Sequence, residues 1–335
     1  MNIYITKLNG ANRRETAQYM QIQTAKIAHQ FGCREMGIYH YNANAENPES
    51  RISRLDGIIA GICAGDIVVC QFPTWNGLKF DRALVDRIIA YHGNVAIFIH
   101  DVPSLMFESD RYLMPEIADL YNQAEVLVAP SYAMKEFLLE NGVRANMKFV
   151  VQEIWDFTTD IDFMDSPRLK KEIHFAGDLG RFLFPHEWDY DIPLKLYSDK
   201  ICTGKTVQCM GWMNPTALLL ELAKGGFGLM WYGDEYMHQY MKYNNNTKMS
   251  AYLAAGIPVI VPFGISNQYL IEGNHLGIVV DSLEEAVEKV RSITEQEYQE
   301  YVSHVGKFAA LLRNGYFTRK LLTEVIHRVS REDVV

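Results

Sequence analysis

The chain has 335 residues, of which 48% are hydrophobic and 22% are charged, a composition that excludes the disordered and fibrous classes. It carries 32 Lys and Arg against 41 Asp and Glu, a net charge of −9. A general nucleic-acid binder is therefore disfavoured, because such proteins use positive charge to bind the phosphate backbone. No stretch approaches the roughly 20 apolar residues of a membrane span, which excludes an integral membrane protein. At roughly 100–200 residues per domain, the length suggests two domains or one large one.

The cysteines and the first residues bear on location. Five cysteines are scattered through the chain without a C-x-x-C pair, which predicts reduced, mostly buried thiols and a cytoplasmic protein. The segment 1–6 has neither the basic head nor the apolar run of a secretion signal,. It is predicted to form the first strand of a domain.

Short apolar runs alternate with helical patterns from residue 1 to about 150. The runs are rich in Val, Ile and Tyr, as buried strands of parallel sheets are. The predicted strands are Asn2–Thr6, Met36–Tyr39, Asp66–Phe72, Asn94–Ile99, Glu125–Val128 and Met147–Val151. Helices are predicted from about Met20 to Phe31 and at Ser50–Gly61, Phe80–His92, Pro115–Gln123 and Ser131–Asn141. This alternation predicts right-handed crossovers and a parallel sheet.

A second alternating series follows residues 155–171, which lack a clear period and are predicted to connect two domains. Its predicted strands are Glu172–Phe175, Leu194–Tyr197, Thr206–Met210, Phe227–Trp231, Ile257–Pro262 and Gly277–Asp281. Its predicted helices are Pro215–Lys224, Thr247–Ala255, Asn267–Glu272, Leu283–Ser292 and a long amphipathic Tyr316–Arg331. Ser282 with Glu285, and Thr294 with Glu297, match the capping box of a helix start,.

These patterns predict an α/β protein of two doubly wound, Rossmann-like domains, residues 1–154 and 155–315, facing each other across a cleft. The helix within 316–335 either returns to the first domain or joins subunits. Ligands of open parallel sheets bind beyond the carboxyl ends of the strands. The architecture therefore favours an enzyme with two substrates, one held by each domain.

Three loops of the first domain follow predicted strands and carry polar groups. Asn9 and Gly10 lead to Thr16, either as a polar turn or as a mobile loop with Thr16 donating to a phosphate or sugar. Trp75 suits sugar recognition, or packs half-buried. His100 and Asp101 form a pair suited to acid–base chemistry or sugar contact, although a lone His near a sheet edge is often structural.

Two sites in the second domain suit phosphate. The turn Gly177–Arg181 lets the main chain approach a ligand, and Arg181 can bind phosphate through two hydrogen bonds,. A helix is predicted to begin after Asn246, and its free N–H groups and dipole attract an anion. Lys248 adds a full positive charge there. The alternative for Arg181 and Lys248 is an exposed surface position.

Metal chemistry has weak support. The ten histidines form no H-x-H or H-E-x-x-H group,. Asp160-Ile161-Asp162 and Asp189-Tyr190-Asp191 each spell D-x-D, a triplet that arises often by chance in an acidic chain. We therefore expect no metal and no cofactor. No G-x-S-x-G elbow or P-loop is present, which argues against hydrolases and NTPases.

The run from Lys248 to Ile260, K-x-x-x-x-L-A-A-G-I-P-V-I, resembles the donor-binding half of GT-B glycosyltransferases. The chain as a whole resembles the glucosyltransferases that perform the second sugar step on serine-rich-repeat adhesins. Stretches carrying this resemblance occur in order nearly end to end, among them Pro73-Thr74-Trp75-Asn76, Phe98-Ile99-His100-Asp101-Val102, Lys171-Glu172-Ile173-His174-Phe175 and Phe317-Thr318-Arg319-Lys320.

The resemblance implies a GT-B fold, a homotetramer, and transfer of glucose from UDP-glucose to N-acetylglucosamine already O-linked to the adhesin. The implied UDP contacts are Thr16, Arg181, Trp212, Asn246, Thr247, Lys248, Met249, Ser250 and Ala251. To the acceptor side we assign Asn9, Gly10, Trp75, Pro103, Ser104, Leu105, Met106, Phe107, Glu108, Ser109 and Asp110. His100 or Asp101 is the catalytic candidate by position.

Two departures leave alternatives open. Many retaining GT-B enzymes carry two glutamates eight residues apart before the L-A-A-G run, where this chain has Tyr243 and Ala251. No catalytic glutamate or stereochemical outcome is therefore assigned, and a catalytically silent GT-B protein that binds the glycosylation machinery is the rival interpretation. Trp212-Met213 replaces an expected Tyr-Arg pair, which leaves UDP-N-acetylglucosamine open as donor. A transferase acting on capsule or lipid-linked sugar is disfavoured, since no basic-hydrophobic membrane patch is apparent.

Overall fold

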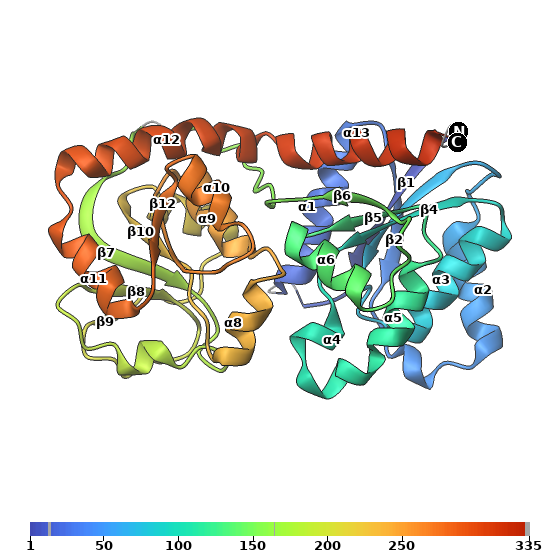
Figure 1. Cartoon of the computed structure of the whole chain (residues 1–335), viewed down its shortest axis with the longest axis horizontal. Helices are drawn as coiled ribbons and strands as arrows, with labels where there is room; N and C mark the ends of the chain where they lie inside the picture. Colours follow the sequence, from blue (N-terminus) through green and yellow to red (C-terminus); the bar gives the residue numbers. More distant parts are fainter. Residues whose placement is uncertain (13–14, 164, 332–335) are drawn as a thin grey trace. The chain divides into compact units, whose positions relative to one another are not determined.

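The computed structural model describes residues 1–12, 15–163 and 165–331. Two units divide the chain: an N-terminal unit of Met1–Glu153 with the segment from Phe317 onward, and a C-terminal unit of Ile154–Tyr316. Residues 332–335 of the predicted C-terminal helical segment lie outside the described residues. Each unit is an α/β structure with helices on both sides of a sheet (Figure 1).

In the N-terminal unit, the described residues form a six-stranded parallel sheet in the order β2-β1-β3-β4-β5-β6. Its strands are β1 (Ile3–Asn9), β2 (Arg34–Tyr39), β3 (Ile67–Phe72), β4 (Asn94–Ile99), β5 (Val126–Ala129) and β6 (Lys148–Val151). Every residue of β3 and β5 is buried, because these central strands are covered on both faces. Their near-continuous apolar runs are what predicted them.

The helices of this unit alternate with its strands. They are α1 (Thr16–Gln30), α2 (Pro48–Ile59), α3 (Leu78–Ala90), α4 (Pro103–Met106), α5 (Met114–Tyr121), α6 (Tyr132–Glu140) and α13 (Tyr316–Ser330), with 3₁₀ turns η1 (Ala43–Ala45) and η2 (Glu108–Leu113). In α13, Leu322 and Val325 are fully buried. The Nζ of Lys148 on β6 donates to the carbonyl oxygen of Arg328, 3.3 Å away.

The described part of the C-terminal unit also holds six parallel strands, in the order β12-β11-β10-β7-β8-β9. They are β7 (Arg168–Ala176), β8 (Leu194–Tyr197), β9 (Val207–Cys209), β10 (Gly225–Leu229), β11 (Val259–Pro262) and β12 (Gly277–Val280). The helices are α7 (Pro215–Leu222), α8 (Glu235–Met241), α9 (Thr247–Ala255), α10 (Gln268–Gly273), α11 (Leu283–Ser292) and α12 (Glu295–Arg313), with the 3₁₀ turn η3 (Phe184–Glu187).

Helix caps account for several boundaries of this unit. The predicted capping box between Thr294 and Glu297 is confirmed at the start of α12. At α11 the Ser282 side chain accepts from Glu285 N–H, but the Glu285 carboxylate accepts from the main chain of Asp281 instead of closing the box. Helix α9 ends at Gly256, whose φ of 93° is the left-handed conformation that glycine adopts without strain,.

The predicted connection 155–171 extends too far at its end, because β7 begins at Arg168. The first residues of β7 are mostly charged and partly exposed, so they lack the apolar run that marks a buried strand. Farther along β7, Glu172 forms an ion pair with Lys195, 3.0 Å from Oε1 to Nζ. Arg168 pairs with Gly225 of β10 across a shift in register, and this main-chain pairing, which a linear pattern does not show, extends the strand.

Candidate functional site

A turn after β7 begins the first candidate site. The main-chain N–H of Gly180 donates to Asp178 Oδ1 at 2.9 Å, and that of Arg181 donates to the Asp178 carbonyl oxygen at 2.9 Å. The Asp178 carboxylate also pairs with Lys200, 2.6 Å from Nζ to Oδ1. A methyl group at Gly177 would lie 2.5 Å from the Phe175 ring, so the turn needs glycine for its close packing.

Helix α9 supplies the second part of this site. The side chain of Asn246 caps the helix by accepting from Lys248 N–H at 3.0 Å,. Packing against the sheet holds the helix in place: a methyl group at Gly228 of β10 would lie 2.2 Å from Tyr252. The Tyr252 hydroxyl accepts from the N–H of Ala176 at 3.0 Å. The start of α9 is thereby fixed beside the end of β7.

Lys248 reaches from α9 toward the β7 turn. Its Nζ lies 3.9 Å from the centre of the Phe182 ring and 5.1 Å from that of Phe175,. Burial among these rings, followed by the positive charge of Arg181, lowers the pKa of Lys248 to about 7, against a smaller opposing effect of Asp178. Arg181 is exposed and makes no ion pair with another described residue. An anion placed here would relieve the repulsion between these two cations.

The sheet topology places this cluster at the position where ligands of such folds bind. In the order β12-β11-β10-β7-β8-β9, the strands that follow β7 are added toward one edge of the sheet, and those that follow β10 are added toward the other edge. Arg181 follows β7, and α9 lies on the connection that follows β10. The cluster therefore lies beyond the carboxyl ends of the strands at a topological switch point. With a helix N-terminus and two basic side chains, it can hold a diphosphate.

The other predicted donor-site residues differ in exposure. The side chains of Met249, Ser250 and Ala251 are buried, whereas Thr247 is half-buried as the first residue of α9. Trp212 follows edge strand β9 and is 45% exposed. Thr16 begins α1 in the N-terminal unit and is exposed.

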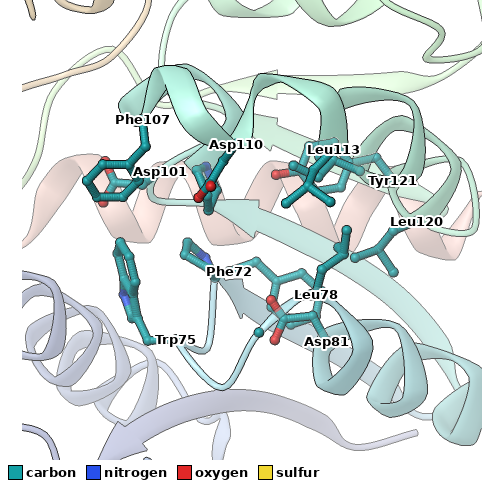
Figure 2. A pocket seen from close by; sticks show the side chains of 14 residues that line it. Phe72, Trp75, Leu78, Asp81, Asp101, Phe107, Asp110, Leu113, Leu120 and Tyr121 are labelled. Atoms are coloured by element: carbon teal, nitrogen blue, oxygen red, sulfur yellow. The ribbon is translucent and has the colours of Figure 1, made fainter. Parts of the chain in front are cut away.

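The N-terminal unit has a pocket of its own, with a cavity volume of about 220 Å³. It lies beyond the carboxyl ends of β3 and β4, beside the reversal of strand order between β1 and β3. Trp75, Asp101 and Phe107 lie at one end and Leu120 and Tyr121 at the other (Figure 2). Of the predicted acceptor and catalytic residues, the pocket brings together Trp75, Asp101, Pro103, Phe107 and Asp110.

The remaining predicted residues of this unit do not line the pocket. Ser104 is buried and donates to the sulfur of Met114 at 3.3 Å. Leu105 and Met106 are half-buried, and Glu108 and Ser109 are exposed on η2. Asn9 is the last residue of β1, and Gly10 follows it, where a methyl group would lie 2.5 Å from the Tyr39 ring.

His100 is buried in a network of amides. Gln71 Nε2 donates to the carbonyl oxygens of Thr6 and Gln21, so its Oε1 is the acceptor for His100 Nε2, 2.9 Å away. This assigns the proton of the imidazole to Nε2. Burial lowers the pKa of His100 to about 3, and the ring is neutral at pH 7. The geometry suits a fixed hydrogen-bonding group better than a proton carrier.

Asp81 is a pocket residue that the sequence analysis did not single out. It lies in the first turn of α3, where an acidic residue is ordinarily explained by the helix dipole,. Here it is 4% exposed and lines the pocket. Burial raises the pKa of Asp81 to about 7, against hydrogen bonds from Thr74 that lower it. The T-W-N run after β3 was the one part of the sequence that pointed to this residue, because the Thr74 hydroxyl donates a hydrogen bond to the Asp81 carboxyl.

Two negative findings concern the described residues alone. Across residues 1–12, 15–163 and 165–331, no group of three or more His, Cys, Asp or Glu side chains is placed to hold a metal ion. In the second D-x-D triplet, Asp189 pairs with Lys205 and Asp191 with Arg291. No helix within the same ranges has the length and apolar character needed to cross a membrane.

Comparison with solved structures identifies the fold. The HepE protein of Anabaena in complex with UDP superposes with a TM-score of 0.68 at 11% identity, covering 98% of this chain and 100% of its own. Its complex with UDP-glucose gives a TM-score of 0.64 at 10% identity, over 97% of this chain and 99% of that one. The chain has the fold of GT-B glycosyltransferases, which confirms the predicted fold class.

Sequence comparison identifies the family. The chain matches the "Glucosyltransferase 3-like" N-terminal domain over residues 2–154 and the C-terminal domain over residues 173–325. Glucosyltransferase 3 of Streptococcus parasanguinis is 43% identical over 330 residues, covering 97% of this chain and 98% of that protein. That of Streptococcus gordonii is 40% identical over 334 residues, covering 98% and 99%. The chain belongs to the glucosyltransferase 3-like family, and the prediction of a glucosyltransferase is confirmed.

Proposed function

We propose that the protein transfers glucose from UDP-glucose to N-acetylglucosamine O-linked to a serine-rich-repeat adhesin. The family membership supports the transferase reaction, and the solved complexes of HepE with UDP and UDP-glucose support the donor. The adhesin acceptor rests on the sequence resemblance. The observation that carries the donor half is the cluster of Arg181, Lys248 and the start of α9.

In this proposal the C-terminal unit holds the diphosphate of the donor. Arg181 and Lys248 bind the phosphate oxygens, and the N–H groups at the start of α9 add further donors. When the bond from glucose to UDP breaks, negative charge grows on the leaving diphosphate. Positive groups fixed in a partly buried site stabilise that charge more than they stabilise the bound donor, which lowers the barrier.

The pocket of the N-terminal unit holds the acceptor sugar in the same proposal. Trp75 and Phe107 offer aromatic faces, and Asp101 is the one of the two catalytic candidates that lines the pocket. We assign Asp101 to contact with the acceptor hydroxyl. We assign His100 to hold that loop through its hydrogen bond to Gln71, because its imidazole stays neutral.

A donor screen with two variants tests this proposal. UDP-glucose, UDP-N-acetylglucosamine and UDP-galactose are each incubated with a serine-rich peptide bearing one N-acetylglucosamine, and the product mass is read. Glucose transfer by the wild type and a loss of at least about tenfold in kcat/KM for Arg181→Ala and Lys248→Ala are expected. Activity within a few-fold of wild type for both variants would refute the phosphate role. If transfer occurs only from UDP-N-acetylglucosamine, this sugar nucleotide replaces UDP-glucose as the proposed donor.

The rival function is a catalytically silent protein that binds the glycosylated adhesin or a partner transferase. Tyr243 and Ala251, at the positions where many retaining relatives carry glutamates, favour it. The cluster of Arg181 and Lys248 argues against it, because a scaffold needs no diphosphate site. Calorimetric titration with UDP separates the two: no detectable heat at millimolar UDP would favour the scaffold.

Location and assembly complete the proposal. A cytoplasmic location is supported by the five cysteines, all of which are free thiols within the described residues. The prediction that most of them are buried is wrong, because only Cys33 and Cys70 of the five are buried. A homotetramer is carried over from the family resemblance. Light scattering coupled to size exclusion measures the assembly directly, and a monomer at micromolar concentration would remove the tetramer from the proposal.

A further inference from the structure

The buried end of the N-terminal pocket has apolar walls and one buried carboxyl. Leu78, Leu113 and Leu120 line this end together with Tyr121 (Figure 2). Leu120 and Tyr121 are 1% and 3% exposed. Asp81 is as deeply buried as these neighbours and also lines the pocket. A carboxyl in such surroundings is costly unless a ligand or the protein satisfies it.

The protein satisfies Asp81 only in part. The Thr74 hydroxyl donates to Oδ1, whereas the main-chain N–H of Thr74 lies 3.4 Å from each carboxyl oxygen. Oδ2 therefore has one long contact and keeps capacity to accept a hydrogen bond from a ligand. The raised pKa of Asp81 agrees with incomplete compensation. Burial, followed by the carboxylates of Asp81 and Asp101, raises the pKa of the Tyr121 hydroxyl in the same pocket.

A second polar group of the pocket lacks a partner. The indole Nε1 of Trp75 is buried and makes no hydrogen bond with any other described residue. Buried N–H groups are nearly always satisfied, so an orphan beside a cavity indicates a ligand acceptor atom. The pocket thus offers a donor, Trp75 Nε1, near the carboxylate of Asp101 at one end, and the acceptor Asp81 Oδ2 among apolar walls at the other.

We propose that Asp81 is a specificity-determining residue that recognises the 2-acetamido group of the acceptor sugar; this inference rests on the proposed function. The acetamido methyl group fills the apolar end between Leu78 and Leu120, and the acetamido N–H donates to Asp81 Oδ2. The sugar ring extends toward Trp75, whose N–H donates to a ring oxygen or hydroxyl.

The dimensions and chemistry favour this ligand over a plain hexose. The cavity, with a volume of about 220 Å³, has room for a sugar ring. A 2-hydroxyl group would leave the leucine side chains facing empty space or water. An acetamido group fills that space and still supplies a donor to the carboxyl.

The test compares two acceptors with the full-length protein and UDP-glucose: the para-nitrophenyl β-glycosides of N-acetylglucosamine and of glucose. The ratio of their kcat/KM values measures recognition of the acetamido group and is insensitive to a general loss of activity. The variants are Asp81→Leu, which removes the polar contact, and Asp81→Asn, which keeps an acceptor oxygen. Asp86→Asn is the matched control, because Asp86 is exposed on the same helix.

We expect Asp81→Leu to lower the preference for the N-acetylglucosamine acceptor by about tenfold, the value of one hydrogen bond. In Asp81→Asn this preference should stay within about threefold of its wild-type value. In Asp86→Asn the preference should equal that of wild type. An unchanged preference in Asp81→Leu would overturn the inference. UDP binding measured by calorimetry should be equal in all of these variants.

Direct binding keeps this inference separate from the proposed function. If the wild type transfers glucose to neither glycoside, the proposed acceptor fails, and saturation-transfer NMR with methyl β-N-acetylglucosaminide then tests the pocket alone. Strong saturation of the acetamido methyl protons in wild type, reduced in Asp81→Leu, supports the inference. Absence of saturation in wild type contradicts it.

Discussion

Replacing Lys248 by methionine should stabilise the ligand-free protein while removing its response to UDP. The ammonium group lies against the rings of Phe175 and Phe182 and near Arg181, and its pKa falls from 10.5 to about 7. At about 1.36 kcal/mol per pKa unit, this corresponds to a cost on the order of 4 kcal/mol at neutral pH. Methionine is unbranched, uncharged and packs well against aromatic rings.

The stability that Lys248→Met gains over wild type should depend on pH in a defined direction. Below pH 7 the lysine is charged in both the folded and the unfolded chain, so the wild type carries the full cost. Between pH 7 and about 10.5 the unfolded chain binds the proton that the folded chain has lost, and the stability of the wild type rises toward that of the variant. The difference between Lys248→Met and wild type is therefore greatest below pH 7.

Thermal denaturation followed by fluorescence measures this difference. At about 2–4 °C per kcal/mol for a unit of this size, Lys248→Met should melt roughly 8 °C or more above wild type at pH 6.5, and the gap should narrow by pH 9.5. Lys205→Met is the control, since Lys205 is exposed and pairs with Asp189 at the surface. A melting temperature equal to or below that of wild type at every pH would refute the reasoning.

The same substitution tests the diphosphate site from the ligand side. UDP should raise the melting temperature of wild type and leave Lys248→Met unchanged, because ligand binding to the folded state alone stabilises it. Bound diphosphate should restore the charge of Lys248, so UDP binding at pH 8 should take up protons. Calorimetry in buffers of different ionisation enthalpy detects this uptake, which Lys248→Met should lack.

Three further predictions concern other residues. Asp81→Asn should raise the melting temperature at pH 8 more than at pH 5, because the folded carboxyl keeps its proton up to about pH 7 while the unfolded one loses it near 3.8,; an equal rise at both pH values would contradict the burial argument. Gly228→Ala should destabilise the protein by about 1–3 kcal/mol and weaken UDP binding, because its methyl group pushes α9 away through Tyr252,; Gly306→Ala, in open space on α12, is the control. Trp212→Ala should weaken UDP binding measured by calorimetry, whereas Trp212→Phe should retain most of it; equal affinities of both variants and wild type would exclude stacking.

Local chemistry made several elements predictable. The predicted helix Thr247–Ala255 matches α9 residue for residue, because Asn246 caps one end and Gly256 stops the other. The predicted Leu283–Ser292 likewise matches α11. Helix α8 was not predicted, since Glu235–Met241 mixes aromatic, charged and apolar residues without a clear stripe, although Asp234 does cap it.

The candidate sites were predictable in position but not in electrostatics. Polar loops after strands indicated where ligands would bind, because parallel strands end at a common edge. The low pKa of His100 comes from burial, and that of Lys248 comes from burial and then from the charge of Arg181. Both causes depend on tertiary packing, which a linear pattern does not show. Asp81 escaped notice for the same reason, since only the tertiary pocket distinguishes it from an ordinary first-turn acid.

The return of the chain to its first unit affects how this protein can be divided. The N-terminal unit includes the segment after Phe317, and Leu321, Leu322 and Val325 of α13 are buried. A fragment that stops at Glu153 would leave the surface under this helix uncovered and prone to aggregate. The chain passes between the two units twice, after Glu153 and before Phe317. Engineering that exchanges the N-terminal unit between relatives must therefore transfer the segment after Phe317 together with Met1–Glu153.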